Sequence, residues 1–197
     1  MIAPEMLLRA YASGWFPMGT GRRNRIEWFS PDPRGILPLD TFHAPARLRR
    51  VVRQGRFDLR VDTAFEAVMR ACASREDTWI TEGIVQSYVQ LHHLGHAHSV
   101  ETWQDDRLVG GLYGVALGGA FFGESMFHTA TDASKVALVA LVDRLVAGGY
   151  ALLDTQWVTP HLVQFGAIEI ARDEYLRRLA LALERDGSFG GRHDRAD

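Results

Sequence analysis

The sequence contains almost no cysteine and no long apolar run. Its single cysteine, Cys72, excludes an internal disulfide framework and a zinc site built from cysteines. No apolar run approaches the roughly 20 residues that a membrane-spanning helix requires. Residues 1–5 also lack the basic and apolar regions of a signal peptide. These absences predict a cytoplasmic protein without a membrane partner.

Lysine is nearly absent as well, since Lys135 is the one lysine among 22 basic residues. Arginine is suited to forked contacts with phosphate, although genomic base composition is the more common cause of such a bias. The net charge of −2 does not predict a nucleic-acid partner. The 197 residues, 47% of them hydrophobic, suffice for one good-sized core and a small appendage.

Residues 1–34 form the least regular part of the chain. Pro4 is suited to the first turn of a short helix that stops at Gly14. Prolines and glycines then punctuate residues 15–34, which we expect to be a loop. Aromatic side chains in a loop either anchor it to the core or form a ligand surface. This loop carries Trp15, Phe16, Trp28 and Phe29.

From Gly35 to residue 187 the hydrophobic spacing predicts one regular domain, followed by a mobile polar tail over residues 188–197. The expected strands cover residues 36–39, 57–61, 98–103, 108–117, 120–127, 150–154 and 168–170. The expected helices cover residues 46–54, 63–73, 82–94, 134–147 and 172–183, with a short helix near His161.

The order of these elements resembles the GCN5-related N-acetyltransferase fold, an α/β or α+β architecture in which helices flank a mixed sheet. That fold usually presents a glycine-rich loop and a helix N-terminus to the pyrophosphate of acyl-coenzyme A. Here the matching junction, residues 128–135, has no Gly-x-Gly run. The sequence therefore favours a different activated acyl donor.

Three polar residues at strand ends are candidates for chemistry. If Phe122, Glu124 and Met126 share a face, Glu124 is a carboxylate among apolar groups, which needs a partner or a raised pKa. It is either a structural residue or a receptor for a cationic amine. Asp154 and Gln156 are two apart, so we expect both side chains to point the same way at the end of a buried strand. They either simply terminate the strand, or they hold a nucleophilic amine and help to remove its proton.

Two further patterns have competing interpretations. Histidines cluster at positions 92, 93, 96 and 98, but Gly95 interrupts the helical spacing, so a helix end is favoured over a metal site. Gly110 and Gly111 within a strand indicate a close approach, either by a ligand or by tight packing.

Residues 41–60 are strongly basic, with six arginines against one aspartate. In the expected helix Leu48, Val51 and Val52 would pack inward and leave the arginines outside. The outer face is either a solvated surface or a set of phosphate contacts whose binding depends on salt.

Taken together, several segments in the same order resemble the leucyl/phenylalanyl-tRNA–protein transferase family, from about Leu7 to Leu179. They are WFSPDPR at 28–34, TWIT at 78–81, LGHAHSVE at 94–101, LVGGLYGV at 108–115, GESMF at 123–127, ASK at 133–135, DTQ at 154–156 and LVQFGA at 162–167.

This resemblance implies transfer of leucine, phenylalanine or, as a further candidate, methionine from charged tRNA. The implied acceptor is a protein that begins with Arg or Lys, which the transfer marks for degradation. It implies no metal and no nucleotide cofactor, because the ester of the charged tRNA already carries the activation. We expect the protein to be a monomer.

The resemblance also assigns roles to individual residues. Asp154 and Gln156 match the catalytic pair, and Glu124 matches an active-site carboxylate. The apolar pocket for the amino-acid side chain is matched by Leu112, Met126 and Leu153. Trp79 matches an aromatic residue that stacks on the terminal adenosine of tRNA. The arginines implied to steer the acceptor stem are Arg47, Arg49, Arg50, Arg53 and Arg56.

Two departures from the family pattern concern the binding of tRNA. The N-terminal segment, residues 1–34, is expected to be truncated, and Met18 stands where the family has a second tryptophan for adenosine stacking. Two other functions remain open. One is an acyl-coenzyme A N-acyltransferase, against which the missing glycine-rich loop argues. The other is a non-catalytic binder of cationic N-termini or RNA.

Overall fold

The computed structural model describes residues 1–20, 25–75 and 77–190. Its centre is a mixed sheet of seven strands in the order β4-β5-β6-β7-β8-β3-β9. These strands are β3 (Arg34–Ile36), β4 (Asp58–Val61), β5 (Ala97–Gln104), β6 (Arg107–Leu117), β7 (Ala120–His128), β8 (Leu152–Gln156) and β9 (Ile168–Ile170). A separate hairpin pairs β1 (Phe16–Thr20) with β2 (Arg25–Phe29).

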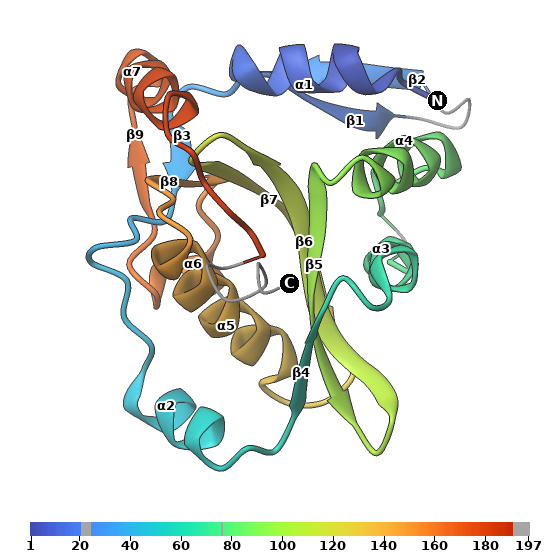
Figure 1. Cartoon of the computed structure of the whole chain (residues 1–197), viewed down its shortest axis with the longest axis vertical. Helices are drawn as coiled ribbons and strands as arrows, with labels where there is room; N and C mark the ends of the chain where they lie inside the picture. The colour runs from blue at the N-terminus through green and yellow to red at the C-terminus, as the bar shows by residue number, and fades with distance from the viewer. Residues whose placement is uncertain (21–24, 76, 191–197) are drawn as a thin grey trace, which may run out of the picture.

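Helices cover both faces of the sheet (Figure 1). The helices are α1 (Pro4–Ala12), α2 (Ala46–Arg53), α3 (Phe65–Ala73), α4 (Glu82–His93), α5 (Ala133–Ala147), α6 (Pro160–Val163) and α7 (Arg172–Leu183). One apolar core lies between the sheet and helices α1, α3, α4 and α7, and a second lies between the sheet and helices α2 and α5. Among the described residues, none of the helices combines the length and apolar character that crossing a bilayer requires.

Local sequence signals account for both ends of α4. The Thr81 hydroxyl accepts a hydrogen bond from the Ile84 amide and caps the start of α4. Gly95, at a φ of 78°, follows the end of that helix as predicted. The predicted mixed sheet with flanking helices is therefore confirmed, as is the order of elements from Phe57 onward.

Of the two interpretations of Gly110 and Gly111, the structure supports tight packing over approach by a ligand. A Cβ atom at Gly110 would lie 2.6 Å from the Ala133 Cβ and 2.7 Å from the Thr102 hydroxyl oxygen. Only a residue without a side chain lets the start of α5 approach β6 this closely.

The prediction of a loop over residues 15–34 is wrong, because this stretch contains the β1–β2 hairpin and the first residue of β3. Pro17 pairs with Trp28 in a two-stranded ribbon, where proline is tolerated because both strands are edges. Residues 21–24 of the predicted loop lie outside the described residues.

The predicted mobile tail after Gly187 is also wrong for Phe189. This side chain is buried and its ring stacks on Phe121 at 5.4 Å between centroids. The apolar contact fixes the chain past the last helix. Residues 191–197, the rest of the predicted tail, lie outside the described part of the chain.

Candidate active site

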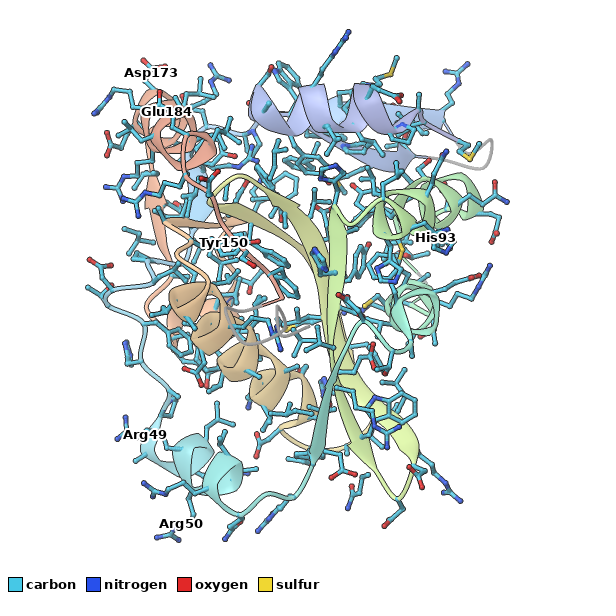
Figure 2. All side chains as sticks on the ribbon, in the orientation of Figure 1. Arg49, Arg50, His93, Tyr150, Asp173 and Glu184 are labelled. Atoms are coloured by element: carbon cyan, nitrogen blue, oxygen red, sulfur yellow. The ribbon has the colours of Figure 1, made fainter. Side chains whose placement is uncertain are left out.

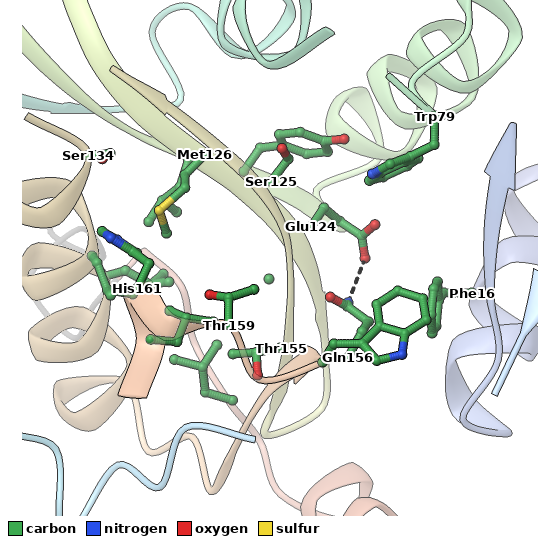
Figure 3. A pocket seen from close by; sticks show the side chains of 18 of the residues that line it. Phe16, Trp79, Glu124, Ser125, Met126, Ser134, Thr155, Gln156, Thr159 and His161 are labelled. Atoms are coloured by element: carbon green, nitrogen blue, oxygen red, sulfur yellow. Dashed lines mark hydrogen bonds between the residues drawn. The ribbon is translucent and has the colours of Figure 1, made fainter. Parts of the chain in front are cut away.

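A cavity of about 410 Å³ opens where strands β7 and β8 part. The two strands pair in parallel from Ala120 with Leu152 to Phe122 with Asp154, and this pairing ends there. Beyond that point, residues 123–126 of β7 and residues 155–157 at and just after the end of β8 line the cavity, and Leu153 of the paired region lines it as well. Figure 3 shows Glu124 of β7 and Gln156 of β8 facing one another across the opening.

Glu124 lies at the point of divergence, on a β-bulge. Tyr113 pairs with Ser125 and Gly114 pairs with Gly123, so Glu124 is an extra residue without a partner on β6.

The bulge reverses the alternation of side chains along β7. Phe122 therefore packs in the core beneath α1, and Met126 packs on the core beneath α5. The prediction that Phe122 and Met126 share a face is wrong for this reason.

Two tyrosines from different helices bind the Glu124 carboxylate. Tyr11 of α1 donates a hydrogen bond of 2.7 Å to Oε1, and Tyr88 of α4 lies 3.4 Å from Oε2. The two hydroxyls also hydrogen-bond to each other. Gln156 reaches the same carboxylate from β8, with its Nε2 atom 3.4 Å from Oε1.

Burial raises the pKa of Glu124 to about 8. The hydrogen bond from Tyr11 opposes this rise, and the nearby negative charge of Asp154 adds to it. Glu124 therefore exchanges its proton near neutral pH, where a general acid or base is most effective.

Asp154 is fully buried and does not line the cavity. Arg34 of β3 binds it through a fork, with Nε 3.0 Å from Oδ1 and Nη2 2.6 Å from Oδ2. Tyr175 of α7 donates a further hydrogen bond of 2.7 Å to Oδ2. The carboxylate thus has a full set of partners on the side of the sheet away from the aminoacyl pocket residues.

Gln156 does line the cavity, although it lies two residues beyond Asp154 in the chain. Its backbone has a positive φ of 58°, which turns the strand end, and its amide donates a 2.8 Å hydrogen bond to Asp154 Oδ1. The two residues do lie together at the strand end, since Gln156 reaches the Glu124 carboxylate and the charge of Asp154 acts on the same group. Asp154 fixes the backbone of Gln156, and Gln156 alone of the two faces the cavity.

The three predicted pocket residues come together at one end of the cavity. Leu112, Met126 and Leu153 all line it, and Leu138 and Leu141 of α5 complete an apolar wall. His161 lies at the same end, beside Met126 in Figure 3. Burial lowers the pKa of His161, so its imidazole is neutral at physiological pH.

The other end of the cavity is aromatic. Trp79 and Phe16 lie there in Figure 3, and Met18 and Trp157 belong to the same lining. The rings of Phe16 and Trp157 meet edge to face at 5.2 Å between centroids. This end offers flat surfaces on which a planar ring can stack.

Unsatisfied polar atoms concentrate around the cavity. In the described part of the chain, four buried side-chain polar atoms have no hydrogen-bond partner. Those of Tyr113, Thr155 and His161 belong to residues that line the cavity. A ligand with polar groups would satisfy atoms that are costly to leave unpaired.

The predicted basic helix face forms α2. Leu48 and Val51 are buried, Val52 is partly buried, and the arginines at 47, 49, 50, 53 and 56 are exposed. Figure 2 shows Arg49 and Arg50 on the outside of this helix. None of these five arginines lines the cavity, but Arg47 bonds to Asp132, the residue just before α5.

Two of the four clustered histidines have structural partners. His92 stacks on Phe65 at 4.3 Å between ring centroids, and His98 binds Asp62 at 2.7 Å. No group of three potential metal ligands occurs among the residues that the structure describes.

Four residues of the site have no role in the sequence-based assignment: Arg34, Tyr11, Tyr88 and Tyr175. Arg34 belongs to one of the family-like segments, and this was the available signal. The tyrosines lie on ordinary amphipathic helices, and nothing in their spacing separates them from core residues.

We expect Arg34→Met to lower the free energy of unfolding by about 3–5 kcal/mol, because it leaves the Asp154 carboxylate buried without a cation. The double variant Arg34→Met with Asp154→Leu should be more stable than Arg34→Met alone. Urea denaturation followed by circular dichroism measures both. If the changes in the free energy of unfolding of the two single variants simply add up in the double variant, Arg34 and Asp154 do not form a coupled ion pair.

Glu124→Gln should stabilise the protein at pH 8 more than at pH 5.5. Because the folded protein holds the Glu124 proton up to a pKa of about 8, the wild type loses stability as the pH rises from the unfolded-state value towards 8. Glutamine carries no such proton and removes this slope. Thermal melting at both pH values tests this, and equal melting shifts would show that the carboxyl is not destabilised by burial.

Comparisons with known proteins identify the family of the chain. A family model described as "Leucyl/phenylalanyl-tRNA protein transferase" matches residues 36–180, and a model of that family's N-terminal domain matches residues 1–32. The leucyl/phenylalanyl-tRNA–protein transferase of Paramagnetospirillum magneticum is 61% identical, over 95% of this chain and 92% of its own length. That of Gloeobacter violaceus is 57% identical, over 92% and 94%.

Among solved structures, the chain is similar to a GCN5-related N-acetyltransferase-like protein from Streptococcus suis, with a TM-score of 0.39 and 13% identity. The match covers 84% of this chain and 63% of that one, and it is too distant to carry an argument. The family models and the sequence relatives, in contrast, extend over nearly the whole chain. The chain belongs to the leucyl/phenylalanyl-tRNA–protein transferase family, a family of aminoacyltransferases.

Proposed function

We propose that this protein transfers leucine or phenylalanine, with methionine as a further candidate, from charged tRNA to the α-amine of an acceptor protein. The observation that carries the proposal is one cavity with three different parts: an apolar end, an aromatic end, and Glu124 with Gln156 between them. An aminoacyl ester of adenosine has three matching parts, namely an apolar side chain, a planar base and a reactive carbonyl.

The apolar end suits the side chain of the donor. Leu112, Met126 and Leu153 offer no charged group there. The thioether of Met126 is flexible and polarisable, so one pocket can hold both a branched and an aromatic side chain.

The aromatic end suits the terminal adenosine. Trp79 offers a flat face for the base, and stacking of this kind is worth about 1–3 kcal/mol. Met18 can cover a base more softly than a tryptophan would, and Phe16 and Trp157 line the same end. The arginines of α2 are proposed to contact phosphates of the acceptor stem.

The central groups suit the attacking amine. An α-amine has a pKa of about 8, so it arrives largely as a cation and must lose one proton before attack. Glu124, with a pKa of about 8, is matched to accept that proton. The neutral amide of Gln156 is a poor base, and we assign to it the orientation of the amine. Asp154 then acts as a positioning residue through the backbone of Gln156.

The bonds balance as an aminolysis. The amine nitrogen forms a bond to the ester carbonyl carbon, and the bond from that carbon to the ribose oxygen breaks. The ribose oxygen takes the second proton of the amine and leaves as a hydroxyl. Because the ester carries the activation, the proposed reaction uses no metal and no nucleotide cofactor.

The family resemblance supports acceptors that begin with Arg or Lys, which the added residue would mark for degradation. The carboxyl group of Glu124, which lines the cavity, offers acceptor oxygens to a cationic N-terminus. Since charged tRNA is made and used in the cytoplasm, we propose that the protein acts there.

The direct test offers the protein radiolabelled leucyl-tRNA and a peptide that begins with Arg. We expect label on the peptide and none on a matched peptide whose α-amine is acetylated. A second arm replaces leucyl-tRNA with labelled acetyl-coenzyme A and should give no transfer. Transfer from acetyl-coenzyme A alone would support the acyltransferase alternative, and binding without any transfer would support a non-catalytic binder.

Asp154→Asn should lower kcat by about 100-fold, because loss of the charge loosens the strand end that positions Gln156. The dissociation constant for leucyl-tRNA should change little, since Asp154 does not line the cavity. Asp143→Asn, an exposed carboxylate on α5, is the matched control. Normal turnover of Asp154→Asn would contradict the positioning role of Asp154.

A further inference from the structure

Arg75 lines the same cavity and takes no part in the proposed reaction. It follows the end of α3 and lies four residues before Trp79 in the chain. Its Nη2 atom donates a hydrogen bond to the carbonyl oxygen of Met126. This bond joins the guanidinium to the strand whose side chains line the apolar end of the cavity.

Among the described residues that line the cavity, Arg75 is the one arginine or lysine. The other basic residues in the lining are His128 and His161, and burial lowers the pKa of His161. The arginines of α2 lie outside the cavity. Arg75 is therefore the one permanent positive charge that the described lining of the cavity contributes.

We propose that Arg75 binds the phosphate on the 5′ side of the terminal adenosine of the donor. The inference rests on the proposed function. If the base stacks on Trp79 and the ester carbonyl lies beside Glu124, the ribose bridges them, and its 5′ phosphate is held close to the cavity wall. A phosphodiester carries a full negative charge, and the planar arginine fork is suited to bind it.

The bond to Met126 gives this contact a second consequence. A guanidinium has five N–H donors, so one can hold the Met126 carbonyl while others bind phosphate oxygens. The phosphate, through Arg75, and the aminoacyl side chain, by direct contact, are then both positioned by Met126 of β7. Arg75 therefore positions the ester relative to Glu124 as well as adding affinity.

The test compares two short donors that differ only in the phosphate: 3′-leucyl-adenosine and its 5′-methylphosphate diester. The measured quantity is the ratio of kcat/KM with the phosphate to kcat/KM without it. For the wild type we expect a ratio of about 10 or more, the size of one charge-assisted hydrogen bond. In Arg75→Gln the ratio should fall close to one, and in Arg75→Lys it should be intermediate, because lysine keeps the charge but lacks the fork.

Arg70→Gln is the matched control. Arg70 lies on α3 and pairs with Glu66 and Glu82 on the surface, and it does not line the cavity. It should keep the wild-type ratio. Because each ratio is taken within one variant, a general loss of stability or activity cancels.

Transfer from intact leucyl-tRNA by the wild type is measured first, so that failure of the proposed function is seen separately. If leucyl-tRNA is a donor but the wild-type ratio is near one, the assignment of Arg75 is overturned. A ratio that is unchanged in Arg75→Gln overturns it as well. Should Arg75→Gln fail to fold, Arg75→Lys decides, since a wild-type ratio in that variant would exclude a forked contact.

Discussion

The buried ion pair between Arg34 and Asp154 is the interaction on which the rest of the site depends. It joins β3 to β8, and the guanidinium also donates a 2.9 Å hydrogen bond to the Gly14 carbonyl and lies 4.3 Å from the centre of the Tyr175 ring. Two charges removed from water are stable only when their geometry is good and their remaining hydrogen bonds are made. This pair meets both conditions, and its purpose is to hold the end of β8 in one place.

Because the end of β8 is fixed, β7 can diverge from it while both strands keep a defined position. The bulge at Glu124 turns a carboxylate out of the regular pleat, and Tyr11 and Tyr88 hold it from helices α1 and α4. The N-terminal helix is thus part of the proposed catalytic centre, because Tyr11 of this helix donates a hydrogen bond directly to Glu124. The result is a carboxyl group with a pKa of about 8 at the edge of an apolar slot.

Regular elements could be predicted from the sequence because their hydrophobic spacing is local. The helix that ends at Gly95 is an example. The pocket residues Leu112, Met126 and Leu153 were instead implied by the family resemblance, and all three line the cavity. The bulge could not be predicted, because it depends on how β7 pairs with β6. The same holds for Arg34, whose partner lies 120 residues away in the chain. The β1–β2 hairpin was hidden because its prolines and glycines are also typical of loops.

The most direct test is a crystal structure with an amide-linked leucyl-adenosine, which cannot be cleaved as an ester. The account predicts that the leucine side chain lies among Leu112, Met126 and Leu153, with the adenine on Trp79. The amide carbonyl should lie within hydrogen-bonding reach of the groups at Glu124 and Gln156. A ligand bound in the opposite direction, or outside the gap between β7 and β8, would contradict the account.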